Sequence, residues 1–228
     1  MISEIEILFE DQWLLIINKP SGLPTQPTVD RKRPSLYTLL LESKKWPYIG
    51  LHHRLDVPTS GIVLLTKHRN ANKGVSELFK DRNMQKNYLC LVNNIPLVDT
   101  FELTNYLKPL KLKTGKTKMV STLSGGDVAH TSFKVLERYN STCLIEASPH
   151  TGRMHQIRTH LAELKFPILG DSLYYRIDRH YSRLMLHASK LTFIHPMTKK
   201  TLSVIAPLPI DFKNAKEQLL KKGTDHSR

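Results

Sequence analysis

The chain has 228 residues, of which 40% are hydrophobic and 24% are charged, a balance typical of a globular protein with one large or two small domains. Its 34 Lys and Arg residues outnumber its 20 Asp and Glu residues, which leaves a net charge of +14. An excess of this size favours nucleic acid as a partner, because phosphates gain from neutralisation and counterion release. An anionic membrane surface ranks second, because no strongly basic amphipathic helix is predicted.

The cysteines and the N-terminus exclude further classes. Cys90 and Cys143 lie far apart in apolar segments and form no Cys-x-x-Cys pair, so we expect buried reduced thiols and no structural zinc site. Acidic residues at positions 4, 6, 10 and 11 surround a start that resembles neither a signal peptide nor a membrane span. We therefore expect a cytoplasmic protein.

In chain order, the first part of the sequence shows apolar runs typical of buried strands, separated by Pro- and Gly-rich turns. Ser35 is a candidate N-cap for a helix, because apolar residues follow it at helical spacing. A loop is predicted between the second strand and this helix, over residues 24–34. The predicted strands are 5–9, 13–18, 62–66 and 88–92, and a second helix is predicted at 70–82.

A basic segment follows between Leu103 and Gly126, which contains no acidic residue. Its Lys-Thr-Gly-Lys-Thr run is not a phosphate-binding P-loop, because Leu110 stands where the first glycine is required. We predict an exposed basic arm that contacts RNA; the alternative is a solvated loop. Its lysines are Lys108, Lys111, Lys113, Lys116 and Lys118.

The second half continues with mixed elements. Strands are predicted at 131–137, 142–147, 184–194 and 201–205, and a helix with an apolar stripe at 154–164. Strands and helices without regular alternation favour the α+β class over a doubly wound sheet. We expect one domain over residues 1–212 and a polar, basic C-terminal tail over 213–228, which holds a short helix that frays.

The carboxylate best suited to chemistry is Asp56. It lies in a loop punctuated by Pro58 and Gly61, and the neighbouring Arg54 favours its ionised form. Such a group can act as a nucleophile or stabilise positive charge. From residue type alone the alternative is stronger, because an Asp in a loop is more often a turn or cap residue.

Two arginines and three histidines are the other candidates. Arg153 and Arg158 fall at the two edges of the apolar helical stripe, so partial burial is expected, and a buried Arg needs an anion. An ordinary salt bridge is the alternative. No metal site is predicted, because no His-Glu-x-x-His pattern accompanies the histidines, which are His150, His155 and His160.

The segment His53–Gly61, His-Arg-Leu-Asp-Val-Pro-Thr-Ser-Gly, resembles the signature of the RluA family of pseudouridine synthases. Asn18–Gly22 resembles the family's lysine-proline turn, Lys86–Tyr88 its tyrosine motif and Thr151–Arg158 its arginine motif. The resemblance runs from about residue 5 to residue 207. Three further segments agree in the family's order: Pro167–Asp171, Leu186–Ala188 and His195–Pro196.

The resemblance implies a single catalytic domain without the S4-type RNA-binding domain of many relatives. Its fold would be α+β, the pseudouridine synthase fold, with a mixed, largely antiparallel sheet and a central catalytic cleft flanked by helices and loops. The chain departs from the family at Thr66-Lys67 and at Asn93-Asn94, away from the catalytic positions. The reaction is an isomerisation of uridine, so no cofactor and no metal is expected.

The resemblance also implies roles for individual residues. Asp56 would attack C1′ of the ribose or remove a proton at C2′, and the sequence leaves both routes open. Arg158 would pair with Asp56, with Arg153 as the second choice, and Tyr88 would stack on the uracil. Enzymes that modify a base extrude it from the helical stack, so a loop or bulge uridine is the expected target. Arg54 would fill the gap left by that base, Leu186 would form an apolar pocket wall, and His53 and Thr59 would complete the substrate-binding set.

The expected partner is a stem-loop of ribosomal or transfer RNA, bound by a monomeric enzyme. Two alternatives belong to other classes. One is an RNA-binding or RNA-chaperone protein that has the fold without turnover, and the other is a metal-dependent nuclease that cuts structured RNA.

Overall fold

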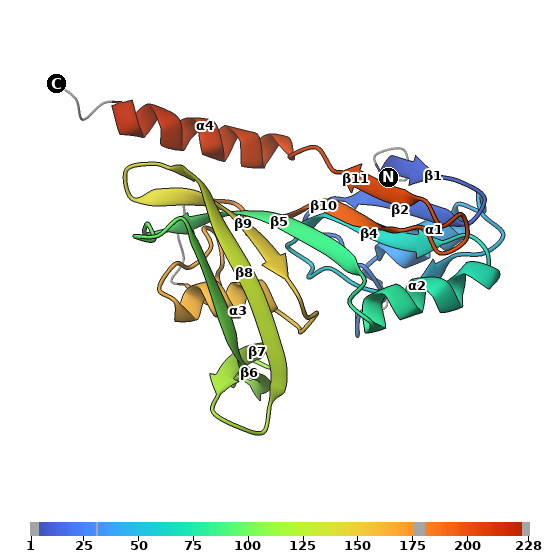
Figure 1. Ribbon diagram of the computed structural model, residues 1–228, viewed down its shortest axis with the longest axis horizontal. Helices are drawn as coiled ribbons and strands as arrows, with labels where there is room; N and C mark the ends of the chain where they lie inside the picture. Colours follow the sequence, from blue (N-terminus) through green and yellow to red (C-terminus); the bar gives the residue numbers. More distant parts are fainter. Residues whose placement is uncertain (1–4, 31, 176–180, 225–228) are drawn as a thin grey trace. The chain divides into compact units, whose positions relative to one another are not determined.

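The computed structural model describes residues 5–30, 32–175 and 181–224. Strands and helices alternate irregularly along the chain, which confirms the α+β class (Figure 1). The chain divides into two compact units. The first unit comprises Met1–Lys86 with His187–Leu208, and the second comprises Asn87–Leu186 with Pro209–Arg228.

The first unit contains a sheet with the strand order β1-β2-β4-β10, to which β3 and β11 add at β4 and β10. All its pairs are antiparallel except β4 with β10. The strands are β1 (Glu6–Glu10), β2 (Leu14–Lys19), β3 (Gly50–Leu51), β4 (Ser60–Thr66), β10 (Leu186–Ile194) and β11 (Thr201–Ile205).

Apolar runs explain why this unit folds as it does. The side chains of β2 and β4 are almost all buried, as expected for strands covered on both faces. Helix α2 (Asn70–Lys80) packs Ala71 and Val75 into the same core. Helix α1 (Leu36–Glu42) begins at Ser35, whose side chain accepts a bond from the Thr38 N–H in a capping box, so the predicted N-cap is confirmed.

The second unit contains an antiparallel sheet with the order β5-β9-β8-β6-β7. Buried and exposed residues alternate along β8, which gives the sheet one covered face. Helix α3 packs near β7, β8 and β9. The elements are β5 (Met84–Asn93), β6 (Thr100–Lys111), β7 (Thr117–Thr122), β8 (Asp127–Arg138), β9 (Thr142–Pro149), α3 (Gln156–Glu163) and α4 (Ile210–Thr224).

Two expectations need correction. No strand was predicted in the basic arm, whereas β6 and β7 pair there as a hairpin with Lys111 opposite Thr117. Its inward residues Leu107 and Met119 are buried, and the lysines between them hid this alternation in the sequence. The helix in the tail is longer than expected, because α4 begins at Ile210, before the predicted start of the tail, and its Leu219 is buried.

Candidate active site

Asp56 lies in the first unit, in the loop between β3 and β4. The Thr59 N–H donates to the Asp56 carbonyl at 3.0 Å, which closes a four-residue turn across Val57 and Pro58. The carboxylate is therefore presented by a tight turn immediately before a buried strand.

A second loop, residues 20–25, holds this turn through its main chain. The Thr25 hydroxyl accepts from the Leu55 N–H at 3.1 Å and donates to the Leu55 carbonyl at 3.0 Å. The Gly22 N–H donates to the Val57 carbonyl at 2.8 Å. Gly22 has a φ of +85°, a left-handed conformation that glycine adopts without strain. These bonds place the Asp56 turn without using its carboxylate.

Lys19 binds main-chain carbonyls of both loops. Its side chain is fully buried, and Nζ donates to the carbonyls of Pro20 at 2.9 Å, Leu23 at 2.8 Å and Val57 at 3.4 Å. A buried ammonium group needs such acceptors, and carbonyl oxygens supply them. The lysine of the lysine-proline turn thus supports the loop of Asp56.

The neighbours of Asp56 differ in their surroundings. Asp56 is partly buried and Arg54 is exposed, whereas Thr59 is buried. The His53 ring stacks on Phe79 with centroids 4.6 Å apart, and its Nε2 accepts from the N–H of Leu64 in β4 at 2.9 Å. Burial, followed by the charge of Lys86, lowers the pKa of His53 to about 3, so the ring is neutral.

The second unit holds the other predicted residues. Tyr88 lies in β5 opposite Ala147 of β9 and is partly exposed. Leu186 is the first residue of β10 and is buried. Asn87, next to Tyr88, is buried and donates from Nδ2 to the Ser148 hydroxyl at 3.2 Å. Successive residues of a strand point to opposite faces, so Tyr88 points away from this contact.

Gln156 fixes the start of α3. Its Oε1 accepts from the Thr151 hydroxyl at 2.6 Å and from the Arg153 N–H at 3.0 Å. Its Nε2 donates to the His130 carbonyl at 2.9 Å and to the Thr131 hydroxyl at 2.8 Å, both on β8. This buried amide thereby locks the turn before α3 onto the sheet and sets the direction of the helix.

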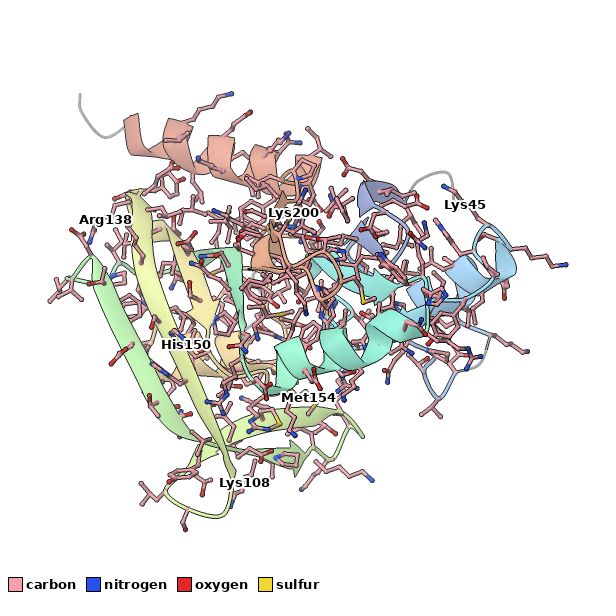
Figure 2. All side chains as sticks on the ribbon, turned by 45° about the vertical axis from the view of Figure 1, so that its right-hand side comes forward. Lys45, Lys108, Arg138, His150, Met154 and Lys200 are labelled. Atoms are coloured by element: carbon pink, nitrogen blue, oxygen red, sulfur yellow. The ribbon has the colours of Figure 1, made fainter. Side chains whose placement is uncertain are left out.

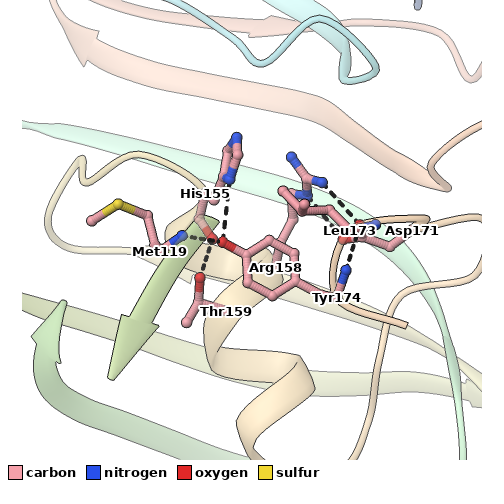
Figure 3. Close-up of polar contacts among 7 residues, drawn as sticks. All are labelled: Met119, His155, Arg158, Thr159, Asp171, Leu173 and Tyr174. Atoms are coloured by element: carbon pink, nitrogen blue, oxygen red, sulfur yellow. Dashed lines mark hydrogen bonds and ion pairs between the residues drawn. The ribbon is translucent and has the colours of Figure 1, made fainter. Parts of the chain in front are cut away.

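Arg158 is held by a buried carboxylate (Figure 3). Its Nε and Nη2 donate to the two oxygens of Asp171, each at 2.8 Å. The Asp171 Oδ1 also accepts from the Leu173 and Tyr174 N–H groups at 3.1 and 3.3 Å. Two parallel bonds between buried charges fix the guanidinium plane.

Arg153 is bound differently. Its Nε donates to the Val128 carbonyl at 3.0 Å, and Nη1 lies 3.8 Å from the exposed Asp127. The partial burial expected of both arginines holds for Arg153, whereas Arg158 is buried more deeply. Sequence reasoning assigned no role to Asp171 or to Tyr174, because neither follows a recognisable spacing from Arg158.

The hairpin carries the basic side chains. Lys108, labelled in Figure 2, is exposed on β6, and Lys111, Lys113 and Lys116 are exposed around the hairpin turn. Lys118 is partly buried. The exposure predicted for this segment is thus confirmed for most of its lysines.

Among the described residues, no group of three or more His, Cys, Asp or Glu side chains is arranged to hold a metal ion. Of the three candidate histidines, His160 is buried and donates from Nε2 to Asn105 Oδ1 at 2.9 Å. Within the described part of the chain, no helix is long and apolar enough to cross a membrane.

The predicted site residues therefore fall into two groups, one in each unit. One group lies in the first unit: His53, Arg54, Asp56 and Thr59. The other lies in the second unit: Tyr88, Arg153, Arg158 and Leu186.

Comparison with known proteins gives consistent matches. Residues 13–163 match the family model described as RNA pseudouridylate synthase. Ribosomal large subunit pseudouridine synthase C of Buchnera aphidicola subsp. Schizaphis graminum is 34% identical over 218 residues, covering 91% of this chain and 68% of the relative. The uncharacterized RNA pseudouridine synthase YhcT of Bacillus subtilis is 34% identical over 224 residues, covering 92% and 71%. The solved structure of human RNA Pseudouridylate Synthase Domain Containing 4 superposes with a TM-score of 0.77 at 27% identity, covering 94% of this chain and 93% of that one.

Proposed function

Because the chain belongs to the family of RNA pseudouridylate synthases, we propose that it converts specific uridines of a structured RNA into pseudouridine with Asp56 as the catalytic residue. Large-subunit ribosomal RNA ranks ahead of transfer RNA as the substrate, because several relatives are named for that activity. The enzyme acts as a monomer in the cytoplasm, where ribosomal RNA is found.

The chemistry requires few groups. The bond between N1 of uracil and C1′ of the ribose breaks, the base rotates, and a bond forms between C5 and C1′. The C5 proton is lost and N1 gains a proton, so atoms balance without a cofactor. Breaking a glycosidic bond builds positive charge on the sugar, which a carboxylate can stabilise or capture.

The Asp56 turn is the observation that carries this proposal. Hydrogen bonds from Thr25, Gly22 and Lys19 hold the main chain of this turn. A catalytic group needs such rigid support from outside itself. The carboxylate acts at C1′ or at C2′, and both routes begin from this geometry.

Arg158 is the proposed ion-pair partner of Asp56. The pair with Asp171 fixes the guanidinium plane, and we assign this guanidinium to Asp56. Arg153 is the weaker choice, since its Nε binds the sheet and its side chain is partly exposed. Tyr88 stacks against the uracil and assists removal of the C5 proton.

Substrate binding involves the remaining residues. Arg54, which is exposed, occupies the gap left by the flipped base, and Leu186 forms an apolar wall. His53 and Thr59 contribute from the Asp56 loop. The exposed lysines of the hairpin bind phosphates, and this offsets the few kcal/mol, roughly, that base flipping costs.

Release of the C5 hydrogen provides the test. RNA that carries tritium at uridine C5 is incubated with the purified protein, and tritium in water is counted. Wild-type protein releases tritium without cutting the RNA, and Asp56→Ala releases none while it still binds the RNA. Asp81→Ala, an exposed residue after α2, serves as the control and keeps full activity. Release by Asp56→Ala, or cleavage of the RNA that stops in EDTA, would contradict the proposal.

A further inference from the structure

Tyr174 contacts both the basic hairpin and α3, the helix that carries Arg158 (Figure 3). Its hydroxyl accepts from the N–H of Met119 in β7 at 2.8 Å. The same oxygen lies 3.2 Å from Nδ1 of His155 and bonds to the hydroxyl of Thr159. All these groups belong to the second unit.

The Tyr174 ring contacts cations from the same two elements. The Arg158 guanidinium carbon lies 5.2 Å from the ring centroid, and the Lys118 ammonium lies 4.8 Å from it. Both distances fall within the range of cation–π attraction. Tyr174 thus meets the hairpin and α3 through its ring as well as through its hydroxyl.

The Tyr174 hydroxyl provides an acceptor for the Met119 N–H at the edge of the sheet. Strand β7 ends the strand order of its sheet, so its outward main-chain groups have no ladder partner among the described strands. Burial raises the pKa of Tyr174, so the hydroxyl stays protonated and neutral. A neutral hydroxyl can accept from the amide while it keeps its own proton for a partner on α3.

Side-chain hydrogen bonds also tie the first strand of the hairpin to α3. Asn105 of β6 donates from Nδ2 to Glu163 Oε2 at 2.8 Å and accepts from His160 Nε2 at 2.9 Å. These bonds involve β6, the first strand of the hairpin, whereas Tyr174 bonds to Met119 on β7, the second strand. Through Tyr174, the second strand of the hairpin is joined at Met119 to the Arg158 guanidinium.

We propose that Tyr174 is a positioning residue that fixes the basic hairpin relative to Arg158. Its hydroxyl anchors the hairpin, and its ring supports the guanidinium. Phosphates bound by the hairpin and a base engaged near Arg158 then keep a constant separation. This inference rests on the proposed function, because it assumes that the hairpin binds RNA and that Arg158 acts in the reaction.

Two substitutions separate the two contacts of Tyr174. Tyr174→Phe removes the hydroxyl and keeps the ring, and Tyr174→Leu removes both. The matched control is Tyr175→Phe, because the Tyr175 hydroxyl accepts from Asn93 Nδ2 at 3.3 Å and is not bonded to the hairpin or α3 in the described contacts. For each protein, the dissociation constant for RNA and the single-turnover rate at saturating RNA are measured, together with the melting temperature.

The expected result is a split between affinity and rate. Tyr174→Phe weakens RNA binding about tenfold, as expected for a lost buried hydrogen bond, and leaves the rate within about twofold of wild type. Tyr174→Leu weakens binding to the same extent and also lowers the rate about tenfold, because the guanidinium loses its aromatic support. Tyr175→Phe changes neither quantity.

Two results would overturn the inference. One is wild-type affinity and rate in both Tyr174 variants. The other is an equal loss of affinity and rate in Tyr174→Phe and Tyr174→Leu that follows their melting temperatures, since Tyr174 would then be a packing residue. Either result leaves the proposed function intact as long as the wild-type protein releases tritium. Absence of tritium release by wild type would instead remove the proposed function.

Discussion

The loop of Asp56 in the first unit is held mainly through main-chain groups, whereas Arg158 in the second unit is held by side chains. Around Asp56, the carbonyls and amides of residues 55–59 bind the opposing loop and the buried Lys19. Around Arg158, the carboxylate of Asp171 takes two bonds, and the ring of Tyr174 lies 5.2 Å from the guanidinium.

This difference follows from what each side chain needs. The Asp56 carboxylate stands on a tight turn, and hydrogen bonds to the main chain of that turn fix where it is presented. A buried guanidinium carries a charge away from water, and removal of its counterion leaves that charge unpaired. Substitutions near Asp56 should therefore displace a loop, whereas those near Arg158 should change stability and charge.

The largest effect on stability is expected for Asp171→Ala. It leaves Arg158 without its bidentate partner, and removing one partner of a buried pair costs about 3–5 kcal/mol. Both side chains are at most 7% exposed. Urea denaturation measures the free energy of unfolding.

The matched control for this change is Asp211→Ala. Asp211 also forms a two-bond pair, with Arg183, but its side chain is 40% exposed. Solvent weakens such a pair, so the loss should be clearly smaller. Equal losses of unfolding free energy in the two variants would contradict the idea that Arg158 depends on a buried counterion.

A smaller loss is expected for Lys19→Met. Methionine fills similar volume, but the carbonyls of Pro20, Leu23 and Val57 lose a donor, which costs about 1–3 kcal/mol. The Asp56 turn loosens, so the single-turnover rate falls while the RNA dissociation constant stays close to that of wild type. The exposed Lys45→Met is the control. A Lys19→Met protein with wild-type rate would show that Lys19 does not support the loop.

The smallest effect concerns pH. His53 is neutral in the folded protein, with a pKa lowered to about 3, and the unfolded chain binds a proton there as pH falls below about 6.5. The contribution of His53 to the stability of the folded protein is therefore fully present above pH 6.5 and is lost as the pH falls towards 3. At pH 5 the loss from this group is at most about 2 kcal/mol.

His53→Gln tests this expectation, because its amide oxygen can still accept from Leu64 N–H. The difference in unfolding free energy between pH 7 and pH 5 should shrink in this variant. His160, whose pKa burial lowers to about 4, remains in both proteins and cancels in the comparison. His68→Gln, at an exposed position, is the control substitution. An unaltered pH dependence in His53→Gln would show that His53 titrates normally.

Local patterns predicted much of this architecture. The N-cap at Ser35 and the burial of Cys90 and Cys143 follow from short-range pattern and polarity, and all are confirmed. The hairpin was missed because its lysines interrupt the apolar alternation on which strand prediction depends.

Contacts between distant residues were not predictable in the same way. Asp171 lies thirteen residues beyond Arg158, across a loop, and no periodicity links the two. Tyr174 meets Met119 over a separation of 55 residues. The family resemblance marked the segment that ends at Asp171, but only the structure assigns a partner to its carboxylate.

Asp56 is proposed to be the residue that makes pseudouridine in cellular RNA. The most direct measurement maps pseudouridines by carbodiimide modification of total RNA from cells that lack the gene and carry either a wild-type or an Asp56→Ala copy. We predict that one or a few uridines, in ribosomal or transfer RNA, are modified only with the wild-type copy. Full modification with the Asp56→Ala copy, or an unchanged map in cells without the gene, would contradict the account.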